Sequence, residues 1–490
     1  MRQSGILMHI SSLPSEGGIG TLGREAYHFA DFLKTAGMRI WQVLPVGPVG
    51  YGESPYQSTS IFAGNPMLID FPRMREEGLL DFKDDELYVP EQHQTVEFDA
   101  VRANKETLLR KAFSQSAAAH KKELDNFVRE NSWVEDYALF TAVKRHFDNA
   151  MWTKWPDKAI RLRQPRALRS YRKKLDEDVR YHIFVQWVFF KQWYALKSYV
   201  NGLGIKLFGD MPIYVAEDSA DTWTHPEVFQ LDKDRVPVRV AGVPPDCFSE
   251  DGQLWGNPLY DWDYLKKTDF AWWVERMRAN SYLYDILRVD HFIGFGNYYS
   301  IPYGAPNAKN GEWILAPGSE LFHTLKRELP GLNVIAEDLG NVTPRVRALI
   351  DETGYPGMKV FTFAFGGGEG NPHDPACYGR NFICYTGTHD NDTALGWYCT
   401  ADEKARKEAR ELLHFTTEAE APYALICGTF RTICDTAIVP MQDVLALPHE
   451  CRMNLPGTTG GNWGWRMLPG AATPVLAEKL HQLNEATGRL

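Results

Sequence analysis

The sequence has few cysteines, no long uninterrupted apolar run and no excess of positive charge. Its seven cysteines are scattered through 490 residues and odd in number, which fits reduced thiols better than a disulfide framework. The nearest approach to a membrane-spanning run, residues 181–193, is interrupted by Gln186 and Lys191. The apolar stretch after Met1 is too short for a signal peptide. We therefore expect a cytoplasmic protein that does not enter a membrane.

The balance of charge also limits the partners. A formal net charge of −10 argues against nucleic acid or another polyanion as the main partner. Residues 154–174 run against this balance and are strongly basic. A solvated helix face is the simpler interpretation of this segment, and a local polyanion site is the alternative. No CxxC pair or Cys/His cluster has the spacing of a zinc site.

Short apolar segments alternate with helical patterns through most of the chain. Helical spacing is seen, for example, in 24–36, 321–329 and 343–352. Eight apolar segments are predicted to be strands: residues 5–9, 39–45, 206–208, 286–289, 333–336, 359–363, 383–385 and 437–439. This alternation predicts an α/β fold, a (β/α)8 TIM barrel.

Two stretches do not fit a simple alternation of strands and helices. Residues 101–201 are charged, helical by pattern and lack glycine. A second stretch, near 217–262, is rich in proline and tryptophan and predicts an irregular insertion. We therefore divide the chain into the first barrel strands with a long binding loop (1–73), a mostly helical insertion (74–200) and the remainder of the barrel (201–490). The oligomeric state does not follow from the sequence.

Polar side chains follow several of the predicted strands at the point where each strand ends. They are Asp210, Arg288 with Asp290, Glu337, and His389 with Asp390. In an eight-stranded barrel these ends converge on one face, where the active sites of this fold lie. Arg288 and Asp290 alternate along one strand, so we expect them to share a face and the arginine to keep the aspartate ionised. Taken alone, that pair fits a structural ion pair better than a catalytic one.

Two of these carboxyl groups are predicted to have different chemical roles. Glu337 follows Asn-Val-Ile-Ala, so apolar walls would raise its pKa and make it a candidate general acid. Asp290, held ionised, is the candidate nucleophile. An acid and an ionised carboxylate that face one another, about 5–5.5 Å apart, are the parts of a retaining glycosidase. Asp338 is expected on the opposite face, as a helix-start or ion-pair residue.

The other polar residues are candidates for holding the substrate. Asp390 with His389 would bind sugar hydroxyls more strongly as the ring flattens toward an oxocarbenium ion. Asp210 would do the same or would cap its strand. A metal hydrolase that uses His9, His291 and His389 is the alternative, but no His-x-His pair supplies two ligands from one strand.

Six motifs, in order along the chain, point to one family. They are Ser54-Pro-Tyr-Gln57, Gly209-Asp-Met-Pro-Ile-Tyr214, Arg288-Val-Asp-His-Phe292, Ala336-Glu-Asp-Leu-Gly340, Thr386-Gly-Thr-His-Asp-Asn-Asp392 and Gly461-Asn-Trp463. The ordered set closely resembles the amylomaltase family of 4-α-glucanotransferases, glycoside hydrolase family 77. The likeness extends over nearly the whole chain.

The resemblance implies transfer of an α-1,4-glucan segment from a donor maltooligosaccharide to the 4-hydroxyl of an acceptor glucan or glucose. It further implies retention of configuration and no cofactor or metal. By position in the motifs, Asp290 matches the nucleophile, Glu337 the acid/base and Asp390 the aspartate that stabilises the transition state. Arg288 and His389 match contacts to the donor sugar.

The resemblance also assigns residues around the cleft. Ser54 and Tyr56 match a secondary glucan-binding loop, and residues 241–255 match a mobile loop that covers the cleft. Trp255 at the end of that loop, with Phe363, would keep water from the glycosyl-enzyme. Asn462 belongs to the last motif and is a further candidate for binding substrate.

Two other functions remain open at this point. A retaining α-glucan hydrolase would use the same carboxylates, because water and a sugar hydroxyl attack the same intermediate. A non-catalytic glucan-binding protein would keep the aromatic residues but should have lost a catalytic carboxylate. All three catalytic carboxylates are present in this sequence.

Overall fold

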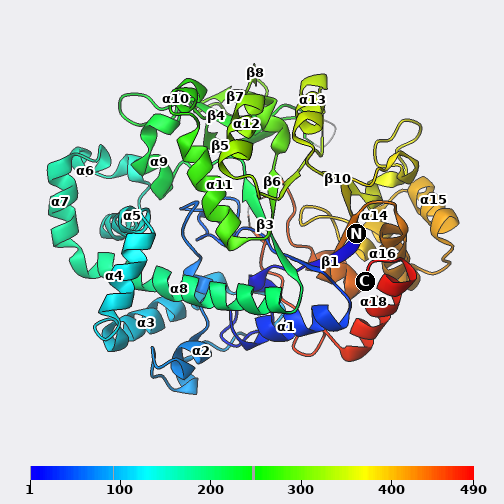
Figure 1. The fold of residues 1–490 in the computed structure, drawn as a ribbon, viewed down its shortest axis with the longest axis horizontal. Coiled ribbons are helices and arrows are strands. Elements are labelled where there is room, and N and C mark those ends of the chain that lie inside the picture. Colours follow the sequence, from blue (N-terminus) through cyan, green and yellow to red (C-terminus); the bar gives the residue numbers. More distant parts are fainter. Residues whose placement is uncertain (1, 92, 246–248, 341, 459) are drawn as a thin grey trace.

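The computed structural model describes residues 2–91, 93–245, 249–340, 342–458 and 460–490 (Figure 1). Eight parallel strands form one barrel-shaped sheet in the order β10-β11-β12-β1-β2-β3-β6-β9. They are β1 (Gln3–Leu7), β2 (Ile40–Gln42), β3 (Lys206–Pro212), β6 (Ile286–Asp290), β9 (Val334–Ala336), β10 (Gly357–Val360), β11 (Phe382–Tyr385) and β12 (Thr436–Pro440). The predicted TIM-barrel fold and its eight strands are confirmed.

The interior of the barrel is a single apolar cluster to which every strand contributes. Its strand members are Leu7, Ile40, Phe208, Ile286, Ile335, Met358, Ile383, Tyr385 and Ile438, and all are buried. Their neighbours in sequence, such as Leu287 and Val289 on β6, pack outward against the helices. Because side chains alternate between the two faces of a strand, residues two positions further on return to the interior. The inward positions that follow Phe208, Ile286 and Ile335 are therefore polar: Asp210, Arg288, Asp290 and Glu337.

The barrel closes between β9 and β10. The backbone N–H of Ala336 donates to the carbonyl of Pro356 over 2.9 Å. Next to this bond, Asp338 Oδ1 accepts a hydrogen bond of 2.7 Å from the backbone N–H of Met358. The expectation that Asp338 would start a helix or form an ion pair is therefore wrong, because its carboxylate joins the two strands at this seam.

Helices surround the barrel (Figure 1). They include α1 (Arg24–Thr35), α11 (Ala271–Leu283), α12 (Gly318–Glu328), α13 (Pro344–Thr353), α16 (Ala421–Arg431) and α18 (Pro474–Ala486). The helices predicted at 24–36, 321–329 and 343–352 are confirmed as α1, α12 and α13. Helix α13 shows why such boundaries can be predicted. Thr343 caps its N-terminus through Val346 N–H, and Gly354 ends it in the left-handed conformation.

Residues 98–202 are almost entirely helical, as the sequence predicts. The helices are α3 (Phe98–Ser116), α4 (Lys121–Glu130), α5 (Val134–His146), α6 (Lys158–Arg161), α7 (Pro165–Lys174) and α8 (Asp176–Gly202). The basic segment forms α6 and α7, where Arg163 and Arg172 both pair with Asp136. The other basic side chains of α7 are exposed. No helix in the described part of the chain is long and apolar enough to span a membrane.

A second, smaller sheet was not predicted. Its antiparallel strands run in the order β5-β4-β7-β8. They are β4 (Arg239–Val243), β5 (Gln253–Pro258), β7 (Asn297–Pro302) and β8 (Glu312–Leu315). The prediction of an irregular insertion near 217–262 is therefore wrong for its later half. Two of its segments become strands because β4 pairs with β5 on one side and, on the other, with β7, which follows β6 in the chain. Local spacing does not reveal such pairing.

Candidate active site

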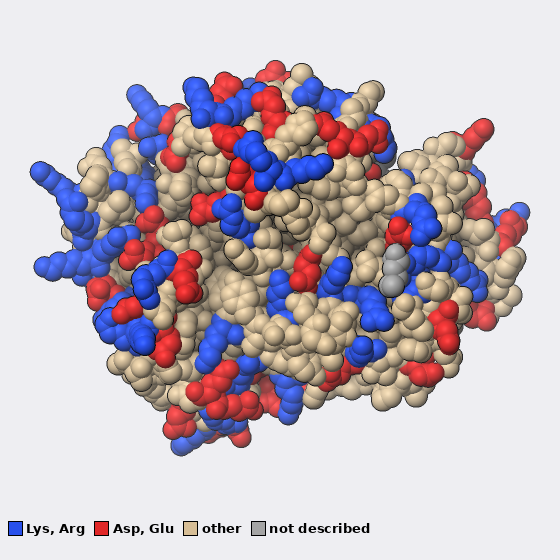
Figure 2. Space-filling view, in the orientation of Figure 1, with Lys and Arg blue, Asp and Glu red and all other residues tan. Residues whose placement is uncertain are grey.

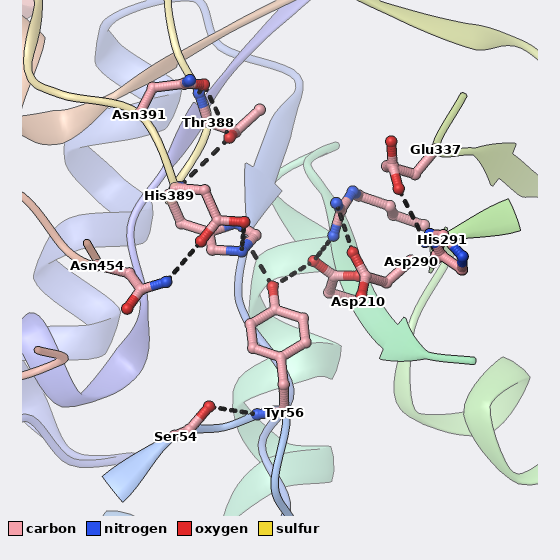
Figure 3. Close-up of polar contacts among 12 residues, drawn as sticks. Ser54, Tyr56, Asp210, Asp290, His291, Glu337, Thr388, His389, Asn391 and Asn454 are labelled. Carbon is pink, nitrogen blue, oxygen red and sulfur yellow. Dashed lines mark hydrogen bonds and ion pairs between the residues drawn. The ribbon is translucent and has the colours of Figure 1, made fainter. Parts of the chain in front are cut away.

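Asp210 and Asp290 lie next to one another in the site (Figure 3), and Arg288 contacts both of them. Its Nη1 is 2.5 Å from Asp210 Oδ2, and its Nη2 is 2.8 Å from Asp290 Oδ1. The register of β3 and β6 sets Asp210 beside Arg288, so the strand pairing itself creates the first contact. Burial lowers the pKa of Arg288, but Asp210 and Asp290 outweigh it and hold that pKa well above its ordinary value. The predicted common face of Arg288 and Asp290 is confirmed, and Asp210 joins them.

Glu337 follows β9 and is buried beside this cluster. Its Oε2 accepts a 2.8 Å hydrogen bond from His291 N–H, and its Oε1 accepts a 2.6 Å bond from Leu339 N–H. Burial raises the pKa of Glu337 to about 8, with Arg288 opposing the rise and Asp290 adding to it. The carboxyl group is therefore protonated at neutral pH, which is the state that a general acid needs.

The backbone at His291 explains how Glu337 is held. His291 follows β6 with a φ of 53°, in the left-handed region that non-glycine residues seldom occupy. This turn directs its N–H at the Glu337 carboxyl group. Strained backbone of this kind is concentrated at functional sites, where the surrounding structure maintains it. Nothing in the sequence pattern marked this conformation.

Asp390 lies on the loop after β11 and is partly exposed. Its Oδ1 accepts a 2.7 Å hydrogen bond from Asn454 Nδ2, and its backbone carbonyl accepts one of 2.9 Å from Arg452. His389 Nε2 is 3.4 Å from Asp390 Oδ2. Sequence reasoning missed Asn454 and Arg452, which lie 64 and 62 residues from Asp390. The one available signal was their closeness to the Gly461-Asn-Trp463 motif.

Tyr56 belongs to the centre of the site. Its hydroxyl donates to Asp210 Oδ2 over 2.8 Å and lies 3.4 Å from His389 Nδ1. Its ring stacks on that of His389 with centroids 5.0 Å apart, and Trp463 borders both rings. The resemblance assigned Tyr56 to a secondary glucan-binding loop, whereas the structure places it among the inward-facing carboxylates. Ser54 supports it by accepting a 3.3 Å hydrogen bond from Tyr56 N–H.

The remaining residues predicted to bind substrate differ in whether they contact the residues of this centre. Trp255, on β5, packs edge-on against His291 with ring centroids 4.9 Å apart. Residues 246–248 of the expected covering loop lie outside the described part of the chain. Asn462 bonds within its own loop, to Leu455 N–H and to Thr458. Phe363 is exposed beside His373 and has no described contact with the carboxylates.

The histidines considered for a metal site are not arranged as ligands. Burial lowers the pKa of His9 to about 3 and that of His291 to about 4. His9 Nδ1 accepts a hydrogen bond from Leu44 N–H, and His389 faces Tyr56 and Asp390. Among the described residues, no group of three His, Cys, Asp or Glu side chains has the geometry to hold a metal ion.

Comparison with known proteins finds relatives that match this chain over nearly its whole length. The sequence model of a family described as 4-alpha-glucanotransferase matches residues 8–471. A 4-alpha-glucanotransferase of Clostridium butyricum is 45% identical over 98% of this chain and 100% of its own length. One of Thermus thermophilus is 47% identical over 100% of this chain and 99% of its own.

Solved structures agree with these sequence matches. Amylomaltase from Streptococcus agalactiae in complex with acarbose is 42% identical, with a TM-score of 0.97 over the whole of both chains. Amylomaltase from Corynebacterium glutamicum is 20% identical, with a TM-score of 0.76 over 99% of this chain and 75% of its own. At that lower identity, the likeness concerns the fold alone.

Proposed function

The chain belongs to the 4-alpha-glucanotransferase family, glycoside hydrolase family 77, and from this membership we propose how its own residues carry out the transfer. The proposed donors are maltooligosaccharides and longer α-1,4-glucans, and the proposed acceptor group is the 4-hydroxyl of a glucan or glucose. The observation that carries the assignment is Glu337, a buried carboxyl group with a pKa of about 8, next to the ion-paired Asp290.

In the first step, Glu337 gives its proton to the oxygen of the scissile glycosidic bond. One carboxylate oxygen of Asp290 bonds to the anomeric carbon as that bond breaks, and the leaving glucan departs as an alcohol. Arg288 Nη2, 2.8 Å from Asp290 Oδ1, holds this carboxyl group in place for the attack. The products of this step are a covalent glycosyl-enzyme and an ionised Glu337.

In the second step, the acceptor's 4-hydroxyl gives its proton to Glu337. The acceptor oxygen bonds to the anomeric carbon and the bond to Asp290 breaks, which restores both carboxyl groups to their starting states. Two inversions at the same carbon leave the configuration unchanged. Glu337 regains in the second step the proton that it gave up in the first, and the bond formed to Asp290 is broken again. The two steps therefore need no metal or cofactor.

The other residues are proposed to bind the donor sugar and its transition state. Asp390, oriented by Asn454, would face the positive charge that develops on the ring. Asp210, Arg288, His389 and Tyr56 form one hydrogen-bonded wall that suits several sugar hydroxyls.

Residues at the rim of the cleft are proposed to favour transfer over hydrolysis. Trp255 covers the His291 side of the site and would exclude water while the acceptor enters. Ser54, Asn462 and Phe363 are proposed as further glucan contacts along the rim. Under this proposal the hydrolase alternative differs only in how well water is kept out.

Incubation of the purified protein with maltotriose tests the function. Transfer yields glucose together with a ladder of longer maltooligosaccharides on chromatography. Products no longer than the substrate would instead establish a hydrolase, and unchanged maltotriose would establish a non-catalytic protein. The Asp290→Asn variant is the control, because it should leave maltotriose unchanged under the same conditions.

The division of the chain and its location belong to the same proposal. Residues 74–200 are proposed to be an insertion into the barrel formed by 1–73 and 201–490. A cytoplasmic location is proposed because the cysteines are few, scattered and odd in number.

A further inference from the structure

A cavity of about 490 Å³ lies at the N-terminal ends of β3, β6 and β9. Its walls come from the turn after α8, the end of α11 and the turn before β9. Asp285 at this cavity and Asp290 at the active site flank the same strand. At about 3.3 Å per residue they are roughly 16 Å apart, at opposite ends of β6. The cavity is therefore separate from the catalytic cleft.

The polar groups of this cavity are almost balanced in charge. Asp285 Oδ1 is 3.4 Å from Lys197 Nζ, and its Oδ2 accepts 2.7 Å and 2.8 Å hydrogen bonds from Asn201 Nδ2 and Leu207 N–H. Lys206 is a further, exposed cation on the wall. A carboxylate already neutralised by a lysine is poorly suited to a free ion, but its remaining lone pairs suit the hydroxyl groups of a neutral ligand.

Two exposed tyrosines lie on α8 and α11, the helices whose C-terminal ends border the cavity. Tyr282, at the end of α11, is 63% exposed, and Tyr194, on α8, is 43% exposed. The carbonyl of Tyr282 accepts a 2.9 Å hydrogen bond from Lys197 Nζ, so α8 and α11 are joined here. Burial raises the pKa of Tyr194, and the nearby Tyr282 adds to the rise. Uncharged surface extends over the region where the two helices meet (Figure 2).

The sequence of α8 places Tyr194 on the same side of the helix as Asn201, which lines the cavity. Tyr194, Lys197 and Asn201 are spaced i, i+3 and i+7, which puts them on one stripe of the helix. This stripe covers about 10 Å at 1.5 Å per residue. The Tyr194 ring is supported from beneath by Phe190, with centroids 5.7 Å apart. We call this stripe, with Tyr282, Asp285 and the cavity, the α8–α11 groove.

We propose that the α8–α11 groove binds a segment of an α-1,4-glucan chain, as a second glucan site remote from the catalytic cleft. The apolar C–H faces of the sugars would lie on Tyr194 and Tyr282, and their hydroxyls would bond to Asp285 and Asn201. The proposal rests on the proposed glucan specificity of the enzyme. Its consequence is tethering: a long glucan held at one end of the barrel raises the local concentration of chain ends at the other.

Native electrophoresis in gels that contain glycogen tests the groove. All proteins carry Asp290→Asn, which stops turnover and keeps the cleft the same in each. Adding Tyr194→Ala and Tyr282→Ala together should weaken glycogen binding about fivefold, since exposed aromatic anchors dominate such contacts. Tyr199→Ala is the matched control, a tyrosine of α8 that is 37% exposed but lies on another stripe. Equal migration of the double variant and its parent would overturn the proposal.

Maltotriose disproportionation separates this proposal from the function of the cleft. With Asp290 intact, the double tyrosine variant should retain the activity of the parent on maltotriose, because this short sugar needs only the cleft. That result also shows that the variant is folded. If the parent makes no ladder, the proposed function fails whatever the gels show. If the double variant loses maltotriose activity, the tyrosines support the fold or the cleft and the groove proposal fails.

Discussion

The Tyr56 hydroxyl donates a 2.8 Å hydrogen bond to Asp210 Oδ2 across 154 residues of sequence. Arg288 contacts the same carboxylate from the other side. Asp210 is buried, and burial raises its pKa against the lowering effect of Arg288. Tyr56 therefore joins the loop after β2 to the charged centre of the barrel. Contacts of this kind should affect the activity of the enzyme, its pH dependence and its stability.

Removing the hydroxyl in Tyr56→Phe should lower kcat/KM for maltotriose about tenfold. A hydrogen bond to a charged group is worth roughly 1.5–3 kcal/mol, and the ring stacked on His389 remains in place. The melting temperature should also fall, because the same hydrogen bond contributes to stability. Tyr199→Phe is a matched control, since its hydroxyl donates to Asp31 at the surface over 2.7 Å. An equal loss of activity in both variants would contradict this role for Tyr56.

The pH profile of kcat/KM should fall on its alkaline side, with a midpoint near 8. The pKa of Glu337 is raised to about 8, so the free enzyme holds the required proton below that pH and loses it above. Initial rates on maltotriose between pH 5 and 10 test this. A profile that stays flat through pH 8 and falls only above pH 10 would remove Glu337 as the acid.

Glu337→Gln should abolish turnover of maltotriose yet still react with α-glucosyl fluoride. Fluoride leaves without a proton, so Asp290 alone can form the adduct, and intact-mass spectrometry should detect it. The adduct should persist, because no base remains to activate an acceptor. Full turnover of maltotriose by this variant would show that another group supplies the proton.

Asp290→Asn should form no such adduct while the fold remains intact. The amide is a poor nucleophile, and Arg288 keeps its other partner, Asp210. Circular dichroism and a melting curve verify the fold, and intact-mass spectrometry after exposure to α-glucosyl fluoride gives the result. A mass increase equal to that in Glu337→Gln would assign the nucleophile to another residue.

Asn454→Ala should lower kcat about tenfold with a smaller change in KM. Asn454 holds Asp390, whose charge matters most in the transition state, so its loss should affect the chemical step more than ground-state binding. Asn454→Gln, which keeps an amide donor, should recover part of the rate. A change in KM alone would instead make Asn454 a contact for the bound glucan.

Arg288→Met should destabilise the protein by about 3–5 kcal/mol at pH 7, because it leaves two carboxylates unpaired inside the barrel. The loss should be smaller at pH 5. Burial raises the pKa of Asp210 in the folded state, so stability is retained at low pH and declines as pH rises. Urea denaturation at both pH values gives the measurement. Arg327→Met, which breaks the exposed pair with Asp269, should change the stability little at either pH.

The barrel and its charged interior could be predicted because they depend on short-range alternation. A short apolar run identified β6, and the alternation of side chains along a strand placed Arg288 and Asp290 on one face. The apolar residues before Glu337 likewise indicated a raised pKa. The family resemblance then supplied the reaction, which the residues alone had limited only to a retaining glycosidase.

The contacts missed from the sequence all depend on long-range pairing. Asn454 reaches Asp390 only because a loop folds back over the end of β11. The pairing of β4 with β7 joins two segments that show no common period. The left-handed turn at His291 is fixed by its surroundings and not by its residue type. These contacts and this turn form only when the barrel is folded. The secondary-structure preferences of the individual residues do not predict them.

The narrow joint between β9 and β10 has a consequence for heat inactivation. In the described part of the chain, one backbone bond and the Asp338 carboxylate join these strands, whereas the β3 and β6 ladder runs through five residue pairs. Glu337 lies on the chain immediately before that carboxylate. We expect the ring of strands to part first at this joint when warmed, since local opening begins where the fewest bonds resist it. The enzyme would then lose its proton donor while most of its helices are still intact.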